Sequence, residues 1–222
     1  YEQFEGYKRG KAQKITLPCQ KVNGCNTANG STSNTVIAKL IINNDGSTDR
    51  VTDFKGYATN YDYNTMGWLT KIDPVDSKWS NTSITYGVVT IAGDGLSGSG
   101  AKVGQLKQTV SQGSSQKLTY FDSMLRPYLV RTRATNSAYT TLYQRSEYDF
   151  ENRTTFSSFP SSAITISSGI RSVFDALGRK TSDTRNTDNA TTRYSYISNN
   201  RSTVTDPKGN ATTTTYLAYG SP

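Results

Sequence analysis

Apolar and polar residues alternate over short stretches of this chain, and the alternation is clearest between Val51 and Thr70. Thr59, Tyr61 and Tyr63 alternate with Ala58, Asn60 and Asp62, a period of two that is typical of a strand with two unlike faces. The same reasoning predicts strands at Val36–Ile42, Thr59–Tyr63, Trp68–Ile72, Ile84–Val88, Leu118–Tyr120, Tyr139–Phe150, Ile164–Ile166, Ile170–Phe174, Arg193–Ile197 and Thr212–Tyr216. Helical periodicity never extends beyond about two turns, and residues 1–35 are expected to be irregular.

Tight turns separate these strands. The segments 53–56 (DFKG) and 64–67 (NTMG) each place Asp or Asn first and Gly fourth. A side-chain oxygen at the first position caps a type I turn, and Gly at the fourth adopts a positive φ without strain. Each turn with its flanking strands therefore predicts a β-hairpin, and Asn43–Gly46 predicts another.

The hairpin unit recurs along the chain. An aromatic residue followed by a turn segment begins at Tyr63, Phe121, Tyr148, Phe174 and Tyr196, while VTDFKGYAT from Val51 returns as VTDPKGNAT from Val204. Asn152 and Asn200 stand where Gly178 stands in its copy, and Asn is the residue after Gly that best tolerates a positive φ. Leu125 breaks this rule, so its turn is expected to differ. The proposed structural positions are Asp53, Gly56, Tyr63, Asn64, Gly67, Phe121, Asp122, Tyr148, Asp149, Asn152, Phe174, Asp175, Gly178, Tyr196, Asn200, Asp206 and Gly209.

These copies resemble the YD repeats of the RHS family, which includes bacterial polymorphic toxins, the cocoon-forming components of insecticidal toxin complexes, and animal teneurins. The segments that carry the resemblance are Tyr61-Asp62-Tyr63, Tyr148-Asp149, Phe174–Arg179 and VTDPKGNATTTTY. The resemblance covers about residues 46–219. We expect a repeat region over residues 46–222, whereas residues 1–45 are expected to form an irregular segment with the Cys loop and the first strand, without a copy. The resemblance implies an all-β chain of antiparallel hairpins in one continuous twisted sheet, part of a hollow β-shell that encloses a C-terminal toxin polypeptide. It also implies that the shell is built together with the remainder of a longer chain.

Composition agrees with an all-β fold. Hydrophobic residues make up 33% of the 222 residues and the mean hydropathy is −0.63, which suits two-faced antiparallel sheets rather than a helical globule. Fifteen tyrosines argue against disorder. The net charge of +8 is spread along the chain, and Arg153, Arg179 and Arg201 follow turn positions, where each is expected to pair with the Asp of its own or the next hairpin. A nucleic-acid partner is not expected without a basic stripe of stacking aromatics.

Cys19 and Cys25 flank a short loop, and their spacing allows either a disulfide or two free thiols. An even cysteine count in a Thr- and Asn-rich chain favours a secreted or cell-surface location. No signal-peptide pattern and no stretch long enough to span a membrane is present.

The sequence offers little for catalysis. It has no histidine, which excludes Ser-His-Asp and Cys-His catalysis and His-ligated metal sites within it. Gly93-x-Gly95-x-x-Gly98 matches a dinucleotide fingerprint as a string, but no helix is expected after it, so a long flexible loop is predicted instead. Asn43–Asp49 lacks the ligand spacing of an EF-hand, which leaves a plain hairpin turn or adventitious calcium. We therefore expect no enzymatic activity, no cofactor and no dedicated metal site.

Two functions fit this pattern. The first is a structural segment of a toxin-enclosing shell, in which the face bearing Tyr61, Tyr63, Tyr194 and Tyr196 packs in register along the sheet. The alternative is a secreted or surface-attached adhesion module that binds glycans through exposed rings such as Trp68, Trp79 and Tyr86. Ladders of rings along one sheet face are the plainer interpretation of these aromatics, since cross-strand pairs each contribute roughly 0.2–1 kcal/mol.

Overall fold

The computed structural model describes residues 7–17, 35–197 and 200–217, and nearly all of them lie in strands and turns. The strands are β1 (Tyr7–Lys8), β2 (Lys11–Ala12), β3 (Lys14–Leu17), β4 (Thr35–Ile42), β5 (Thr48–Asp53), β6 (Ala58–Tyr63), β7 (Leu69–Pro74), β8 (Thr82–Val88), β9 (Leu106–Gln112), β10 (Ser115–Phe121), β11 (Pro127–Ala134), β12 (Ser137–Tyr148), β13 (Thr154–Ser158), β14 (Gly169–Phe174), β15 (Lys180–Arg185), β16 (Ala190–Ile197), β17 (Arg201–Thr205) and β18 (Ala211–Thr215). One 3₁₀ turn, η2 (Ala92–Gly95), is the helical element of the described part.

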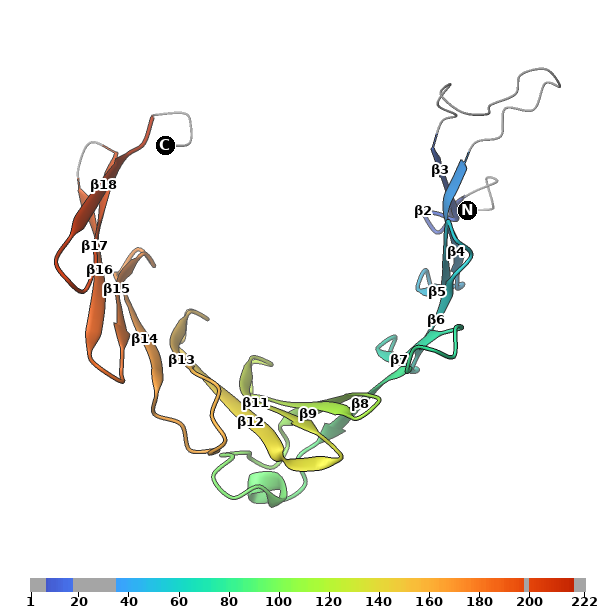
Figure 1. Cartoon of the computed structure of the whole chain (residues 1–222), viewed down its shortest axis with the longest axis horizontal. Helices are drawn as coiled ribbons and strands as arrows, with labels where there is room; N and C mark the ends of the chain where they lie inside the picture. Colours follow the sequence, from blue (N-terminus) through green and yellow to red (C-terminus); the bar gives the residue numbers. More distant parts are fainter. Residues whose placement is uncertain (1–6, 18–34, 198–199, 218–222) are drawn as a thin grey trace. The chain divides into compact units, whose positions relative to one another are not determined.

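Strands β3 to β18 form one antiparallel sheet of 16 strands, in which each strand is hydrogen-bonded to its neighbours in sequence (Figure 1). β1 and β2 form a separate two-stranded ribbon. The prediction of an all-β chain of repeated hairpins is confirmed. Because every connection joins adjacent antiparallel strands, each strand edge inside the sheet is covered by the next hairpin.

The pairing register shows how the hairpins are closed. It shifts by one residue just before the turns, between Ile41 and Ile42, Asp62 and Tyr63, Glu147 and Tyr148, and Val173 and Phe174. Such a shift next to a positive-φ residue is the G1 bulge that follows a type I turn in a three-residue hairpin loop.

The chain divides into two compact units. Unit 1 comprises residues 1–85 and 109–115, and unit 2 comprises residues 86–108 and 116–222. The predicted segment boundary between residues 45 and 46 falls inside the β4–β5 turn of unit 1, and that division stays a prediction. Among the described residues of unit 1, the buried hydrophobic side chains are Ile42 and Ala58.

Unit 2 has a compact hydrophobic cluster, formed by Val89, Ala101, Leu118, Tyr120 and Leu129. Val89 and Ala101 bracket the glycine-rich segment 93–100, so this segment folds over the sheet instead of extending from it. Its Ser99 is fully buried, and the Ser99 hydroxyl donates to the Gly93 carbonyl over 2.8 Å.

The contacts of Arg145 fix the same segment. Its guanidinium donates to the carbonyls of Gly98, Ser99 and Ile164. The segment is a loop, as predicted, but burial of Ala101 and these hydrogen bonds hold it in place, so the expectation that it is flexible is corrected.

Two further predictions are corrected. Residues 164–166 form no strand, with bends at 164 and 165, and Ile164 packs against the hydrophobic cluster of unit 2. The apolar residues that predicted a strand at Ile164–Ile166 therefore indicate burial and not strand pairing. In the first 35 residues, expected to be irregular, residues 7–8, 11–12 and 14–17 form strands, and Lys14–Leu17 pairs with β4.

Candidate functional site at the hairpin turns

One turn recurs with the same backbone hydrogen bonds throughout the described chain. In each copy the N–H of the first residue donates to the carbonyl four residues on, and the N–H of the fourth residue donates to the carbonyl of the first, over 2.9–3.3 Å. The copies are residues 43–47, 53–57, 64–68, 122–126, 149–153, 175–179 and 206–210. Seven turns of one geometry make this the structural unit of the fold.

A carboxylate or amide oxygen caps most of these turns. The Asp53 Oδ1 atom accepts from the N–H groups of Lys55 and Tyr57, both over 2.9 Å. The first residue does the same at Asn64, Asp122, Asp149, Asp175 and Asp206. The cap explains why the position is Asp or Asn, since only their short side chains reach the N–H groups two and four residues on.

The fourth residue of the turn has a positive φ, as the glycine pattern indicated. The φ angle is 87° at Gly56, 77° at Gly67 and 71° at Asn152. Leu125 has a φ of 60° and its turn retains all the backbone and capping bonds of the others. The expectation that this turn would differ is wrong: the sheet and the Asp122 cap hold Leu125 in the left-handed region, at a cost of roughly 1–2 kcal/mol.

In unit 2 an arginine follows the positive-φ residue and joins its turn to the next hairpin. The Arg126 Nε atom donates to the Asp122 Oδ2 atom over 2.7 Å, while its Nη1 atom donates to the Asp149 carbonyl over 2.7 Å. The guanidinium also lies 4.7 Å from the centre of the Tyr148 ring. One side chain thus binds its own turn by charge and the following turn by a hydrogen bond and a cation–π contact.

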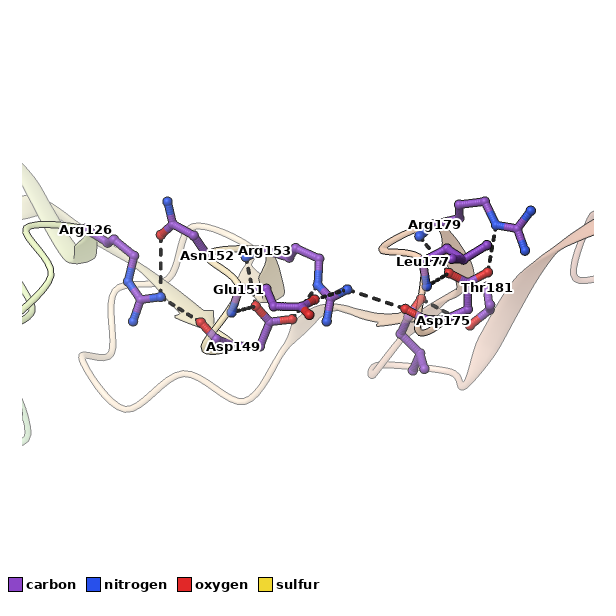
Figure 2. A network of polar contacts seen from close by, with 10 residues as sticks. Arg126, Asp149, Glu151, Asn152, Arg153, Asp175, Leu177, Arg179 and Thr181 are labelled. Atoms are coloured by element: carbon purple, nitrogen blue, oxygen red, sulfur yellow. Dashed lines mark hydrogen bonds and ion pairs between the residues drawn. The ribbon is translucent and has the colours of Figure 1, made fainter.

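The ion pair and the ring contact recur in the next two hairpins, and the carbonyl bond recurs in the first of them. Arg153 binds Asp149 over 2.6 Å and the Asp175 carbonyl over 3.4 Å, and stacks 4.9 Å from the Phe174 ring. Arg179 binds Asp175 over 2.8 Å and lies 4.3 Å from the Tyr196 ring. Figure 2 shows the resulting chain of contacts from Arg126 to Asp175. We call these contacts the arginine staples.

Tyrosine hydroxyls form a second link between successive hairpins. Tyr63 donates to the Thr48 carbonyl over 3.0 Å, Tyr148 to Pro127 over 2.8 Å, and Tyr196 to Lys180 over 2.8 Å. Each acceptor is the carbonyl of the residue that directly follows the preceding turn on the same side of the sheet, where the preceding turns are residues 43–47, 122–126 and 175–179. The hydroxyl therefore fixes the register of one hairpin relative to the hairpin before it.

The staples hold the pKa of the turn carboxylates below the ordinary value. For Asp122 and Asp149, burial alone would raise the pKa, but the hydrogen bonds and charge of Arg126 and Arg153 outweigh it. The backbone N–H of Arg179 is the main cause of the lowered pKa of Asp175. These carboxylates are therefore charged acceptors in the folded chain, with no proton to donate near neutral pH.

The remaining predicted positions fit the unit less completely. Asp206 caps its turn, with Gly209 at a φ of 90°, but Asn210 takes the place of arginine and donates to the Asp206 Oδ2 atom over 2.7 Å. Asn200 has a φ of 55°, and its turn has Ile197 where the acid would stand. Phe121 precedes the Asp122 turn at the end of β10. Cys19 and Cys25 lie outside the described residues, so their pairing stays a prediction.

Sequence reasoning missed one buried polar group in unit 2. Asp94 accepts two hydrogen bonds from the Lys107 ammonium over 2.7 Å and one from the Tyr120 hydroxyl over 2.9 Å. Burial, then the bond to Asp94, raises the pKa of Tyr120, so this phenol stays protonated. The group anchors the 93–100 segment to β9 and β10. An Asp between two glycines was the only local signal.

The described residues offer no metal-binding cluster. None of their His, Cys, Asp and Glu side chains form a group of three suited to a metal ion. At Asn43–Ser47 the Asp45 Oδ1 atom accepts from the Ser47 N–H and hydroxyl, the arrangement of a plain hairpin turn. Gly93 and Asp94 have positive φ angles inside η2, and this turn provides no helix N-terminus for a phosphate. No helix in the described part is long and apolar enough to cross a membrane.

The fold has relatives among solved structures. No family model matches the chain, and a search of the curated proteins found no match. Two crystal structures, one described as TcdB2-TccC3-Cdc42 and the other as TcdB2-TccC3, each match 93% of this chain with a TM-score of 0.57 and 15% sequence identity. The chain spans only 11% and 12% of those chains. At this identity the likeness is one of fold.

Proposed function

We propose that the chain is a structural segment of an RHS-type YD-repeat shell, whose complete form encloses a C-terminal toxin polypeptide until delivery. The observation that carries the proposal is the repeated hairpin with its arginine staple, which resembles the YD repeat residue by residue at Tyr148-Asp149 and Phe174-Asp175. The similarity of the fold to chains of TcdB2-TccC3 also supports this proposal.

The arginine staples are suited to a sheet that serves as the wall of a shell. In a sheet built from successive hairpins, side-chain contacts between neighbours add to the backbone bonds that resist opening. In unit 2 the staples of Arg126 and Arg153 each bind the next hairpin by a carbonyl bond and a ring contact. The staple of Arg179 binds it by a ring contact, and in all three an ion pair holds the arginine to its own turn. Containment, not catalysis, is the activity that such an arrangement performs, and a toxin polypeptide is its partner.

The experiment requires the complete reading frame that contains this segment. The full-length protein is purified and treated with a protease of broad specificity, and the C-terminal region is followed by mass spectrometry. We expect that region to resist digestion in the intact protein and to be digested rapidly when it is expressed alone. A C-terminal region digested at the same rate in both forms contradicts encapsulation.

A matched pair of variants sharpens the test. Asp122→Ala removes a stapled cap, whereas Lys102→Ala changes an exposed side chain outside the staples. Asp122→Ala is expected to speed digestion of the enclosed region, and Lys102→Ala to leave the rate unchanged. Extracellular delivery is part of the proposal and is tested separately, by fractionating cells that express the full-length protein.

A further inference from the structure

Unit 1 contains a cavity that the shell function does not use. It has a volume of about 480 Å³ and is lined by Tyr57, Ala58, Thr59, Pro74, Asp76, Lys78 and Trp79. These residues come from the end of the β5–β6 turn, the start of β6, and the connection from β7 to β8. A cavity of this size is within the range of small-ligand sites.

Two aromatic rings in its wall face solvent. Tyr57 is 59% exposed and Trp79 is 68% exposed. Neither has a place in the staple pattern: Tyr57 follows the positive-φ residue of its turn, where Arg126 stands in unit 2, and Trp79 lies outside any turn copy. Large rings left in water beside a hollow are a common mark of a ligand or partner site.

The backbone around the cavity is already fixed. The Val75 N–H donates to the Ala58 carbonyl over 2.9 Å, and the Trp79 N–H donates to the Asp76 carbonyl over 3.1 Å. The Asp76 Oδ1 atom accepts from the Lys78 N–H over 3.0 Å. A ligand therefore meets a preformed wall, which reduces the entropy lost on binding.

We propose that this cavity binds a saccharide. Its walls are mainly apolar, as a sugar ring requires for stacking its C–H face on an aromatic plane. Asp76 and Lys78 in the lining carry a carboxylate and an ammonium, the groups that bind hydroxyls. An apolar ligand would offer no hydrogen-bond partner to either charged group. The proposal is independent of the shell function, and either can fail without the other.

Tryptophan emission gives a direct readout. The chain has two tryptophans, Trp68 and Trp79, so Trp68→Ala leaves Trp79 as the single emitter. The same variant is a matched control, because Trp68 occupies in its turn the position that Tyr57 occupies in the preceding one, without lining the cavity. A glycan array of neutral and acidic saccharides is probed with the full chain at physiological salt, and array hits are titrated against Trp79 emission.

We expect at least one saccharide to bind the full chain and the Trp68→Ala variant equally and to change the emission of Trp79. Trp79→Ala and Tyr57→Ala should each weaken binding by about tenfold, measured by calorimetry, since a lost stacking contact is worth about 1.4 kcal/mol. An array without hits overturns the proposal, as does unchanged affinity in Trp79→Ala. Binding of indole, but of no saccharide, would identify an apolar-ligand groove and also overturn it.

Discussion

Turns of the same backbone geometry make different side-chain contacts in the two units. In unit 1 the residue after the positive φ is Ser47, Tyr57 or Trp68, and the first residue of the turn is Asn at two of the three turns. In unit 2 three successive turns on one side of the sheet pair an Asp cap with an arginine. The comparison separates two requirements that the repeat combines.

Closing a hairpin needs only a capping oxygen and a residue that accepts a positive φ, and Asn64 with Gly67 provides both. Coupling a hairpin to the next needs more: a carboxylate to hold the arginine, and an aromatic ring for it to stack on. Turn formation is thus a local property, whereas coupling is a property of pairs of hairpins.

The largest expected effect is that unit 2 unfolds in acid before unit 1 does. The pKa values of Asp122, Asp149 and Asp175 are lowered in the folded chain. As the pH falls, the unfolded chain therefore binds protons at a higher pH than the folded chain does. Their stabilisation is complete above the ordinary Asp pKa of 3.8 and is lost as pH falls through the lower folded values. Hydrogen exchange measured at falling pH should show β10–β15 opening early, while the Asn64 cap of unit 1 does not titrate.

Asp122→Asn serves as the control for the acid experiment. It retains an oxygen for the cap but has no titrating group, so the variant should be less stable at pH 7 and less sensitive to acid. Equal acid sensitivity in this variant and the parent chain would show that the stapled carboxylates do not cause the transition.

Removing a cap should cost more in unit 2 than in unit 1. Asp122→Ala loses two backbone bonds and the ion pair with Arg126, so we expect the free energy of unfolding to fall by about 2–3 kcal/mol. Asn64→Ala loses only the two backbone bonds and should cost about 1 kcal/mol. Urea titrations monitored by hydrogen exchange measure both, and equal losses would remove the distinction between the units.

A smaller effect is expected from exchanging the positive-φ residues. Leu125→Asn relieves a strained backbone and should stabilise unit 2 by about 1 kcal/mol, because Asn152 already fills the equivalent position at a φ of 71°. Gly67→Leu imposes the same strain in unit 1, where a Cβ would meet no atom within 4 Å, and should destabilise it by about 1 kcal/mol. Thermal unfolding measures the pair. Shifts of the same sign would exclude backbone strain as the cause.

The smallest effect tests the tyrosine link. Phe174 stands where Tyr148 and Tyr196 place hydroxyls on preceding carbonyls, and the equivalent acceptor for it is the Thr154 carbonyl. Phe174→Tyr should therefore stabilise unit 2 by about 0.5–1 kcal/mol, and Tyr148→Phe should destabilise it by a similar amount. Denaturant midpoints decide the matter, and a destabilising Phe174→Tyr would show that the pattern does not extend to this hairpin.

The sequence by itself determined the hairpins, because their signals are local. Asp53 and Gly56 lie in one turn, and the alternation of Thr59, Tyr61 and Tyr63 specifies the strand beside it. The Leu125 turn shows the limit of local reasoning: side-chain identity predicted a different turn, but the surrounding sheet imposed the shared one.

Only the tertiary structure decided which groups meet across hairpins. The contact of Arg126 with Asp149, 23 residues away, depends on the register of the strands between them. Burial of the 93–100 segment against Tyr120, and the packing of Ile164 without a strand, depend equally on distant partners. Such contacts follow from the arrangement of whole strands, which no short window of sequence contains.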